Sequence, residues 1–342
     1  MDRNYERLWE EMLEEFRALG GIADNVRLDD GPLGRGLFPI DPSKPIRVLI
    51  PESLLVDLKY ITIGIDGVFR LHPEAPVGEH ERFFLENYQR DFSWGISHQD
   101  SKALLQMVHE APVELREFLE SPLETSEWLA GPFPKAIGER FLSSRVYSRV
   151  TGRAVIMPIV ELANHGPNTG YEDDGQVIGL SGLFSGEILV QYNSGDPLDF
   201  FHGWGFASPT ERFALSLAFR LETSSGPIVI KRDRDPFAID TDKKPFYPEV
   251  SMEGDELTLS SLLLGHKDMP LLPRSIFYQL MRDFSRSGAE EIFEKIQHIN
   301  RMQFYKLNAL SESAAPQLGR MLRDLARYQL EAMSHYIGTA PI

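Results

Sequence analysis

Hydrophobic residues near the amino terminus recur at steps of three and four positions, the spacing of one face of an α-helix. The pattern begins at Tyr5 and reaches Leu19, and Gly20-Gly21 ends it. The sequence therefore predicts an amphipathic helix in this region. Its apolar positions are Tyr5, Leu8, Trp9, Met12, Leu13, Phe16 and Leu19.

Short apolar runs of β character follow this helix and return after residue 150. Turn residues separate them, as in Asp41-Pro42-Ser43-Lys44-Pro45. One longer stretch, 214–221, places Leu215, Leu217 and Phe219 at alternate positions, which is typical of a strand. The predicted strands are 26–28, 36–40, 47–51, 155–160, 177–180, 188–192 and 214–221.

Helical spacing dominates two other parts of the chain. Between residues 83 and 142, prolines at 112, 122, 132 and 134 divide the pattern into several short helices. After about residue 222 the chain is mixed and then helical, and the last helix lies between Leu318 and Tyr336. We expect an α+β fold with short strands, a helical insertion and a mostly helical C-terminal domain. The expected segments are 1–82, 83–142, 143–221 and 222–342.

Composition narrows the classes of function. The 342 residues contain 35 Lys plus Arg and 51 Asp plus Glu, a net charge of −16, which argues against nucleic acid as a partner. The absence of cysteine excludes disulfides, Cys-ligated zinc, iron–sulfur clusters and cysteine nucleophiles. The sequence contains neither a secretory signal nor an apolar run of about 18 residues. We therefore expect a cytoplasmic protein without a membrane partner.

Several common catalytic motifs are missing. There is no phosphate-binding loop, no Gly-x-Ser-x-Gly elbow and no His-Glu-x-x-His pair. Gly34-Arg35-Gly36 lacks the third glycine of a dinucleotide fingerprint and precedes a predicted strand. The run Glu172-Asp173-Asp174 suggests a metal-dependent hydrolase, but no His stands at ligand spacing, so we interpret it as a solvated hairpin and expect no metal.

Three segments carry the remaining candidate chemistry. The first is Ser144-Arg145-Val146-Tyr147-Ser148-Arg149, which is followed by Glu161 and Asn164-His165. The second is 186–192, which ends in Tyr192. The third is Gly203-Trp204-Gly205-Phe206. In this order after Gly34-Arg35-Gly36, they resemble the SET-domain protein methyltransferases. The Rubisco large-subunit methyltransferase group, which includes an actin histidine methyltransferase, is the most similar. The resemblance covers about residues 5–221 and, more loosely, the helical tail, where this group carries a substrate-binding domain.

The resemblance implies a protein N-methyltransferase that uses S-adenosyl-L-methionine to methylate lysine, or histidine, in a protein substrate. It implies that Tyr192 is catalytic, with its hydroxyl beside the sulfonium and the transferred methyl. Backbone near Gly34 and Gly36 would lie against the cofactor, because glycine allows close approach. The implied cofactor-binding residues are Leu33, Gly34, Arg35, Gly36, Arg145, Asn164, His165 and Phe206, and the implied substrate-binding residues are Arg149, Glu161, Tyr171 and Trp204.

Two departures from the family pattern leave a second function open. Trp204 stands where the family usually has a second tyrosine or a small polar residue, and Asp196-Pro197-Leu198-Asp199 lacks the usual Ser-Asn pair. A bulky indole would narrow the substrate channel. The alternative is a catalytically weak or inactive SET-type module that binds a peptide or protein.

Structural roles would also explain several of the candidate residues. Arg149 and Glu161 suit a salt bridge as well as a substrate contact. Trp204 and Phe206 suit core packing, and Arg145 suits a surface ion pair.

Overall fold

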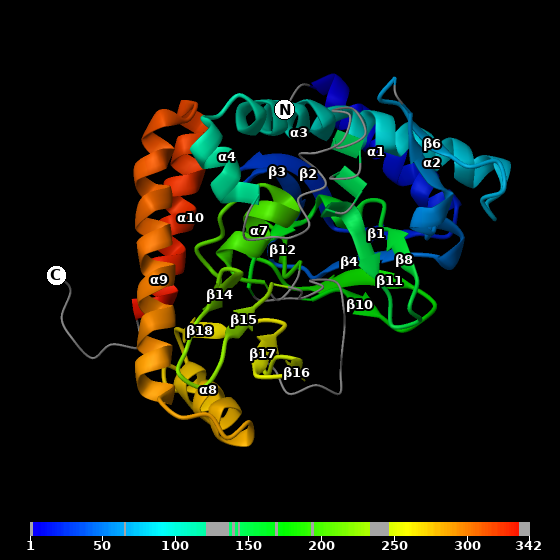
Figure 1. The fold of residues 1–342 in the computed structure, drawn as a ribbon. Helices are drawn as coiled ribbons and strands as arrows, with labels where there is room; N and C mark the ends of the chain where they lie inside the picture. The colour runs from blue at the N-terminus through cyan, green and yellow to red at the C-terminus, as the bar shows by residue number, and fades with distance from the viewer. Residues whose placement is uncertain are drawn as a thin grey trace. The chain divides into compact units, whose positions relative to one another are not determined.

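A computed structural model describes residues 3–64, 66–120, 137–138, 141–142, 144–167, 170–192, 195–232 and 246–334. The chain divides into two compact units (Figure 1). The first unit comprises residues 1–102 and 131–194, and the second comprises 103–130 and 195–342. Residues 195–221, which sequence analysis grouped with the preceding β-rich segment, thus belong to the second unit.

The first unit contains a four-stranded antiparallel sheet in the order β1-β4-β11-β10. Strand β11 pairs along β4, with Leu180 opposite Val48, and so joins segments that are 130 residues apart in the sequence. The strands are β1 (Ile22–Asp24), β4 (Ile46–Ile50), β11 (Ile178–Gly182) and β10 (Glu172–Asp173).

Aromatic packing joins the first two helices of this unit. Helix α1 (Arg3–Ala18) is the predicted amphipathic helix, and it buries Trp9 and Phe16. Phe16 stacks on Phe84 of α2 (Glu79–Phe92) with ring centroids 5.9 Å apart, and Trp9 meets Phe92 edge-on at 5.3 Å. Such contacts add to the hydrophobic burial that holds an amphipathic helix in place.

Four strand pairs complete the first unit, three of them antiparallel. These are β2 (Val26–Gly31) with β3 (Gly34–Pro39), β5 (Ile61–Ile63) with β6 (Phe69–Leu71), and β7 (Val146–Ser148) with β8 (Ala154–Ile156). The fourth pair, β9 (Asn164–His165) and β12 (Leu189–Val190), is parallel. Short 3-10 helices cover Glu52–Leu54, Leu58–Tyr60 and Val160–Leu162.

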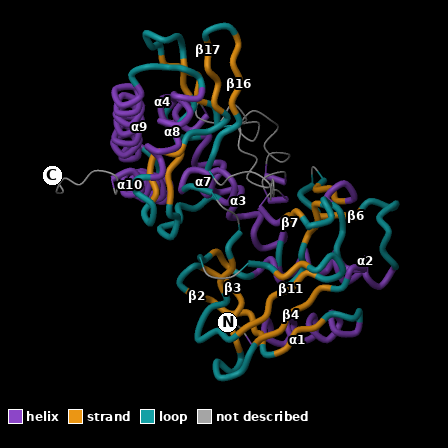
Figure 2. The backbone as a smooth tube through the Cα atoms, turned by 90° about the horizontal axis from the view of Figure 1, so that it is seen from below, coloured by secondary structure: helices purple, strands orange, loops and turns teal. Residues whose placement is uncertain are grey.

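The second unit combines helices with two small sheets (Figure 2). Its long helices α9 (Ala289–Leu310) and α10 (Pro316–Ser334) run side by side (Figure 1). Helix α3 (Trp94–His109) begins in the first unit and ends in the second. The other elements are α4 (Val113–Glu120), α7 (Pro197–Trp204), β13 (Phe213–Leu215) paired with β18 (Leu263–His266), the sheet of β14 (Phe219–Leu221), β15 (Ile228–Ile230), β17 (Glu256–Leu259) and β16 (Val250–Glu253), α8 (Leu272–Asp283) and a 3-10 turn, Ser311–Ser313.

The predicted α+β class is confirmed: small, mostly antiparallel strands alternate with helices, and the C-terminal region is largely helical. Three local predictions are wrong. The strand predicted over 155–160 ends early, because β8 covers Ala154–Ile156 and Val160 begins a 3-10 helix. The single strand predicted over 214–221 is two strands, β13 and β14, because buried Asn300 of α9 accepts the backbone N–H of Leu217 at 2.8 Å and so takes it out of any ladder. The strand predicted over 188–192 shortens to Leu189–Val190. Much of the predicted helical insertion, from 121 to 136, lies outside the described residues.

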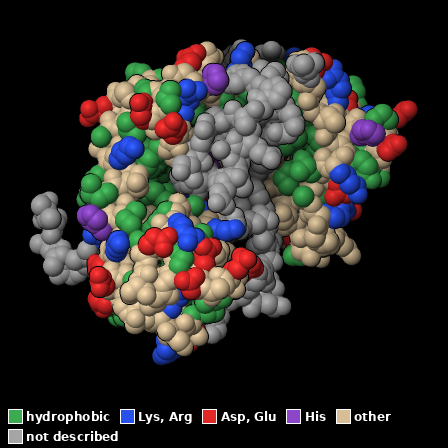
Figure 3. Space-filling model, in the orientation of Figure 1, with side chains coloured by type: hydrophobic (Ala, Val, Ile, Leu, Met, Phe, Trp, Pro, Cys, Tyr) green, Lys and Arg blue, Asp and Glu red, His purple; other side chains and the backbone are tan. Residues whose placement is uncertain are grey.

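Charged side chains of both signs lie close together on the surface of the second unit (Figure 3). Arg274 of α8, for example, pairs with Glu290 at 2.8 Å and with Glu294 at 2.7 Å, both on α9. Within the described part of the chain, no helix has the length and apolarity needed to cross a membrane.

Candidate active site

Tyr192 lies beside the Asn164-His165 segment in the first unit. Its hydroxyl donates a hydrogen bond to the carbonyl of Ala163 at 2.8 Å, and its backbone N–H donates to Nδ1 of His165 at 3.3 Å. The two rings lie 5.3 Å apart at 55°. Three contacts therefore fix the position of the predicted catalytic tyrosine relative to this segment.

Parallel pairing explains why these residues meet. Leu189 lies opposite Asn164 and Val190 opposite His165, and the N–H of Gly166 bonds to the carbonyl of Val190 at 2.9 Å. Tyr192 lies two residues after the end of β12. Because the two strands are parallel, their C-terminal ends meet, and Tyr192 therefore lies near the residues that flank His165.

The Gly34-Arg35-Gly36 hairpin joins the same cluster through Asn164. The Asn164 side chain donates from Nδ2 to the carbonyl of Arg35 at 3.2 Å and to Oε1 of Glu187 at 2.6 Å. The Ile188 N–H bonds to the carbonyl of Leu37 at 2.8 Å. Three predicted motifs from three parts of the sequence thus meet in one hydrogen-bonded set.

Two residues of the predicted cofactor motif point elsewhere. The Arg35 guanidinium donates to the hydroxyl of Tyr5 at 2.7 Å and to the carbonyl of Phe92 at 2.8 Å, so it ties the hairpin to α1 and α2. The Leu33 side chain is largely exposed to solvent. Any contact of these two residues with a cofactor stays a prediction.

Arg145 and Glu161 lie near Tyr192. Nη1 of Arg145 donates to the backbone carbonyl of Glu161 at 2.9 Å, and the guanidinium lies 5.5 Å from the ring centre of Phe141. The buried Glu161 carboxylate accepts from Nε2 of Gln89 at 3.2 Å. Arg145 is therefore a half-buried cation that contacts a backbone carbonyl and an aromatic ring.

Burial dominates the electrostatics of the cluster. It raises the pKa of Tyr192 to about 12, an effect that Arg145 opposes and that Glu161 and Glu187 reinforce. Burial likewise raises the pKa of Tyr171 well above its usual value, with a further rise from Tyr192. It also raises the pKa of Glu161, against the opposing effect of Arg145. These mutual effects indicate that Tyr171, Tyr192, Arg145 and Glu161 lie near one another, and both phenols keep their protons at neutral pH.

Arg149 is held by two acids. Its buried guanidinium pairs with Glu52 and, at 3.0 Å, with Asp173. Asp173 also accepts the backbone N–H of Val150 at 3.1 Å. These bonds describe the structural salt bridge foreseen as an alternative, and a substrate contact of Arg149 stays a prediction.

Trp204 and Phe206 belong to the second unit. Both rings pack on Phe200 of α7, Trp204 stacked at 5.0 Å and Phe206 tilted at 5.7 Å. Gly205 ends the helix between them in the left-handed conformation, with φ of 82°. Their roles in binding substrate and cofactor stay predictions.

Sequence reasoning assigned no role to three residues that complete the cluster: Ala163, Tyr147 and Glu187. Ala163 acts through its backbone carbonyl, for which a sequence carries no signal. Tyr147 meets Tyr171 edge-on at 5.3 Å, and its place in the Ser-Arg-aromatic-Ser-Arg run was the available signal. Glu187 stands inside the 186–192 segment that ends in Tyr192.

The acidic run 172–174 is engaged in local bonds. Glu172 accepts from the Ser181 hydroxyl, and Asp174 accepts the backbone N–H groups of Gln176 and Val177 at 2.8 and 2.9 Å. Among the described residues, no group of three or more acidic or histidine side chains is arranged to hold a metal ion.

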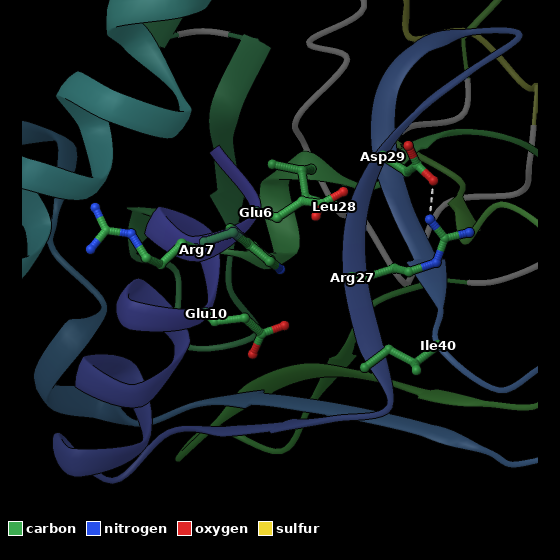
Figure 4. Close-up of a pocket in the computed structure, with 8 residues that line it drawn as sticks. Glu6, Arg7, Glu10, Arg27, Leu28, Asp29 and Ile40 are labelled. Carbon is green, nitrogen blue, oxygen red and sulfur yellow. Dashed lines mark hydrogen bonds and ion pairs between the residues drawn. The ribbon is translucent and has the colours of Figure 1, made fainter. Parts of the chain in front are cut away.

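A surface pocket of about 650 Å³ lies between α1 and β2 (Figure 4). Arg27 and Asp29 of β2 form an ion pair on one side, while Glu6 and Glu10 of α1 face the pocket from the other. Its lining contains none of the predicted site residues. This pocket is therefore separate from the Tyr192 cluster.

Neither a protein-family model nor a curated protein sequence matches this chain. The structure is similar to a solved structure of the SET domain of LSMT bound to lysine and AdoHcy. The sequence identity is 14% and the TM-score 0.47, and the alignment covers 96% of this chain and 90% of that one.

Proposed function

We propose that the chain is an S-adenosyl-L-methionine-dependent protein N-methyltransferase that methylates a lysine or histidine side chain. One observation carries the proposal: the predicted glycine, Asn-His and tyrosine motifs, 130 or more residues apart at their extremes, meet in one hydrogen-bonded cluster around Tyr192. The order of these motifs along the chain supports the same function.

The residues present fit such a cofactor. A Cβ built on Gly34 would meet no atom within 4 Å, so the hairpin leaves open space at its turn. The Asn164 carboxamide lies against the same hairpin at Gly36, and Arg145 supplies a half-buried positive charge suited to a carboxylate. The cofactor would supply an electrophilic methyl group on a sulfonium.

The chain's own contribution is alignment and protonation control. Tyr192 commits its proton to the Ala163 carbonyl, so its oxygen presents acceptor lone pairs to an N–H of the target side chain. Its pKa of about 12 keeps the phenol neutral at physiological pH. The target nitrogen must be uncharged when it attacks, and a neutral phenol does not favour the ammonium form as a phenolate would.

Methyl transfer from labelled cofactor to proteins of a lysate tests the proposal. We expect labelled protein with the native chain, and a loss of at least about 100-fold in rate for Tyr192→Phe, which removes one positioned hydroxyl. Tyr305→Phe, at an exposed tyrosine of α9, is the matched control. Full activity of Tyr192→Phe would contradict the assigned role, and mass spectrometry of the product distinguishes lysine from histidine.

A binding module without turnover is the second candidate. The segment that lacks the family's Ser-Asn pair is used structurally, because Asp196 and Asp199 cap α7 and pair with Arg232. A thermal shift with S-adenosylmethionine separates the two candidates: ligand at about 100 times its dissociation constant should stabilise an enzyme by roughly 2.7 kcal/mol. No shift at millimolar cofactor favours the binding module.

A further inference from the structure

Glu187 lies over the β2–β3 hairpin at the place where both strands carry glycine. A Cβ at Gly36 would lie 2.5 Å from Oε1 of Glu187 and 2.7 Å from Nδ2 of Asn164. A Cβ at Gly31 would lie 2.9 Å from Oε2 of the same carboxylate. Each carboxylate oxygen thus occupies the space that a side chain on the hairpin would need.

The two glycines of the Gly-x-Gly motif are needed for different reasons. Gly34 has φ of +95°, a conformation that L-residues rarely adopt, and open space where its Cβ would point. Gly36 does not have a positive φ, so its backbone would accept alanine. A Cβ at Gly36 would instead have to displace the hydrogen-bonded Glu187 and Asn164 side chains.

The same carboxylate orients Asn164. Both bonds of the Asn164 amide come from Nδ2, one to Glu187 at 2.6 Å and one to the Arg35 carbonyl at 3.2 Å. With its two N–H groups directed to these acceptors, the carboxamide oxygen must point the opposite way. The Ile188–Leu37 backbone bond and the pairing of β12 with β9 hold the backbone next to Glu187 in place.

We infer that Glu187 is a positioning residue: its carboxylate fixes the orientation of the Asn164 amide and locks the glycine hairpin against β9. Close approach at Gly36 therefore serves Glu187 and Asn164, whereas the resemblance implied that it serves the cofactor. The expected effect of Glu187 on cofactor affinity rests on the proposed function. The steric fit between Glu187 and Gly36 does not depend on that function.

Calorimetric titration with S-adenosylhomocysteine tests the positioning role. Glu187→Gln keeps an oxygen that accepts from Asn164, so we expect its dissociation constant within about threefold of the native value. Glu187→Ala removes the acceptor, and we expect at least about tenfold weaker binding, equivalent to 1.4 kcal/mol. Native affinity in a folded Glu187→Ala chain would overturn the positioning role, and so would equal losses in both variants. A native chain that does not bind the ligand at all would contradict the proposed function instead.

A double-mutant cycle tests the steric match without any ligand. Gly36→Ala should lower the folding equilibrium constant at least about tenfold more in the native background than in Glu187→Ala. Truncation removes the carboxylate oxygen nearest the Cβ and frees the Asn164 amide, the other group that the Cβ would meet, to turn away. Gly34→Ala is the matched control. It should lower the folding equilibrium constant by the same factor in both backgrounds, because only the positive φ of Gly34 disfavours a side chain there. If Gly36→Ala lowers the folding equilibrium constant by factors that agree within about twofold in the two backgrounds, the inference is overturned, whatever the titration shows.

Discussion

Two buried carboxylates, Glu161 of the first unit and Asp196 of the second, lie in very different surroundings. Asp196 in the second unit, fully buried, accepts the backbone N–H groups of Leu198, Asp199 and Leu215, the Gln329 amide at 2.7 Å and the Arg232 guanidinium. Glu161 in the first unit, 4% exposed, accepts a hydrogen bond from the Gln89 amide at 3.2 Å and lies near Arg145, Ser93 and Tyr88.

The difference indicates that Asp196 stabilises the fold, whereas Glu161 affects the protonation of its neighbours. Five donors from four elements and loops converge on Asp196, so its charge holds the start of α7, β13, α10 and the Arg232 segment together. Around Glu161 the groups that affect its pKa are Arg145, Ser93, Tyr88 and Gln89, and Glu161 in turn raises the pKa of Tyr171 and Tyr192. Well-satisfied burial favours stability, whereas burial among phenols favours control of protonation.

The largest effect is expected at Asp196. Asp196→Asn keeps the side-chain volume but leaves the buried Arg232 guanidinium with Asp199 as its remaining acid, at 2.7 Å. We expect the free energy of unfolding of the second unit to fall by about 3 kcal/mol, measured by chemical denaturation. A loss below about 0.5 kcal/mol would remove the distinction between the two acids.

Glu161→Gln should act in the opposite direction. Burial raises the pKa of Glu161 above its usual 4.5, so the folded state binds more protons than the unfolded state, and stability falls as pH rises through that interval. The glutamine variant lacks this fall, and we expect it to gain on the order of 1 kcal/mol on the native chain between pH 4 and pH 7. Denaturation at both pH values measures the gain, and a difference that does not change with pH would contradict it.

His266 gives the second unit a pH response of its own, with a smaller effect. Its buried Nδ1 accepts the backbone N–H groups of Asp268 and Met269, each at 3.2 Å, and burial lowers its pKa below 6.5. The unfolded state therefore binds the proton first, and stability falls as pH drops below about 6.5, by less than about 1 kcal/mol.

Hydrogen exchange of the β13 and β18 amides, followed by mass spectrometry, measures this response. His266→Asn keeps a hydrogen-bond acceptor near the Nδ1 position but does not titrate. In this variant, the protection of the β13 and β18 amides, corrected for the intrinsic exchange rate, should not change between pH 7 and pH 5.5. An equal response in both chains would rule His266 out as the source.

The smallest effect is expected at an exposed ion pair. Asp324 and Arg327 of α10 lie 2.8 Å apart with about half of each side chain exposed. Asp324→Ala should change the free energy of unfolding by less than about 0.5 kcal/mol, since exposed pairs gain little over hydration. The same denaturation experiment as for Asp196 provides the comparison, and similar losses at both sites would mean that burial does not set the energetic scale here.

Periodicity predicted the elements whose partners are nearby in the sequence. Helix α1 and the helix from Pro316 to Ser334 follow from apolar spacing, because a helix forms its own hydrogen bonds and needs only a face to bury. The two-strand break at Leu217 did not follow, because the residue that causes it, Asn300, lies 83 positions away. The parallel pair β9–β12 was missed for the same reason: two residues a strand are too few to carry a pattern.

For the candidate site, too, the sequence predicted some features and the tertiary structure decided the others. The order of the glycine, Asn-His and tyrosine motifs, the α+β class and the acidic, cysteine-free composition are properties of the sequence by itself. Only the tertiary structure decided that Arg149 pairs with Glu52 and Asp173, that Arg35 faces Tyr5, and that Gly36 makes room for Glu187 and Asn164. The physical reason is that residue type and spacing encode local geometry, whereas the partner of a buried charge is set by long-range packing, where several acceptors compete for each donor.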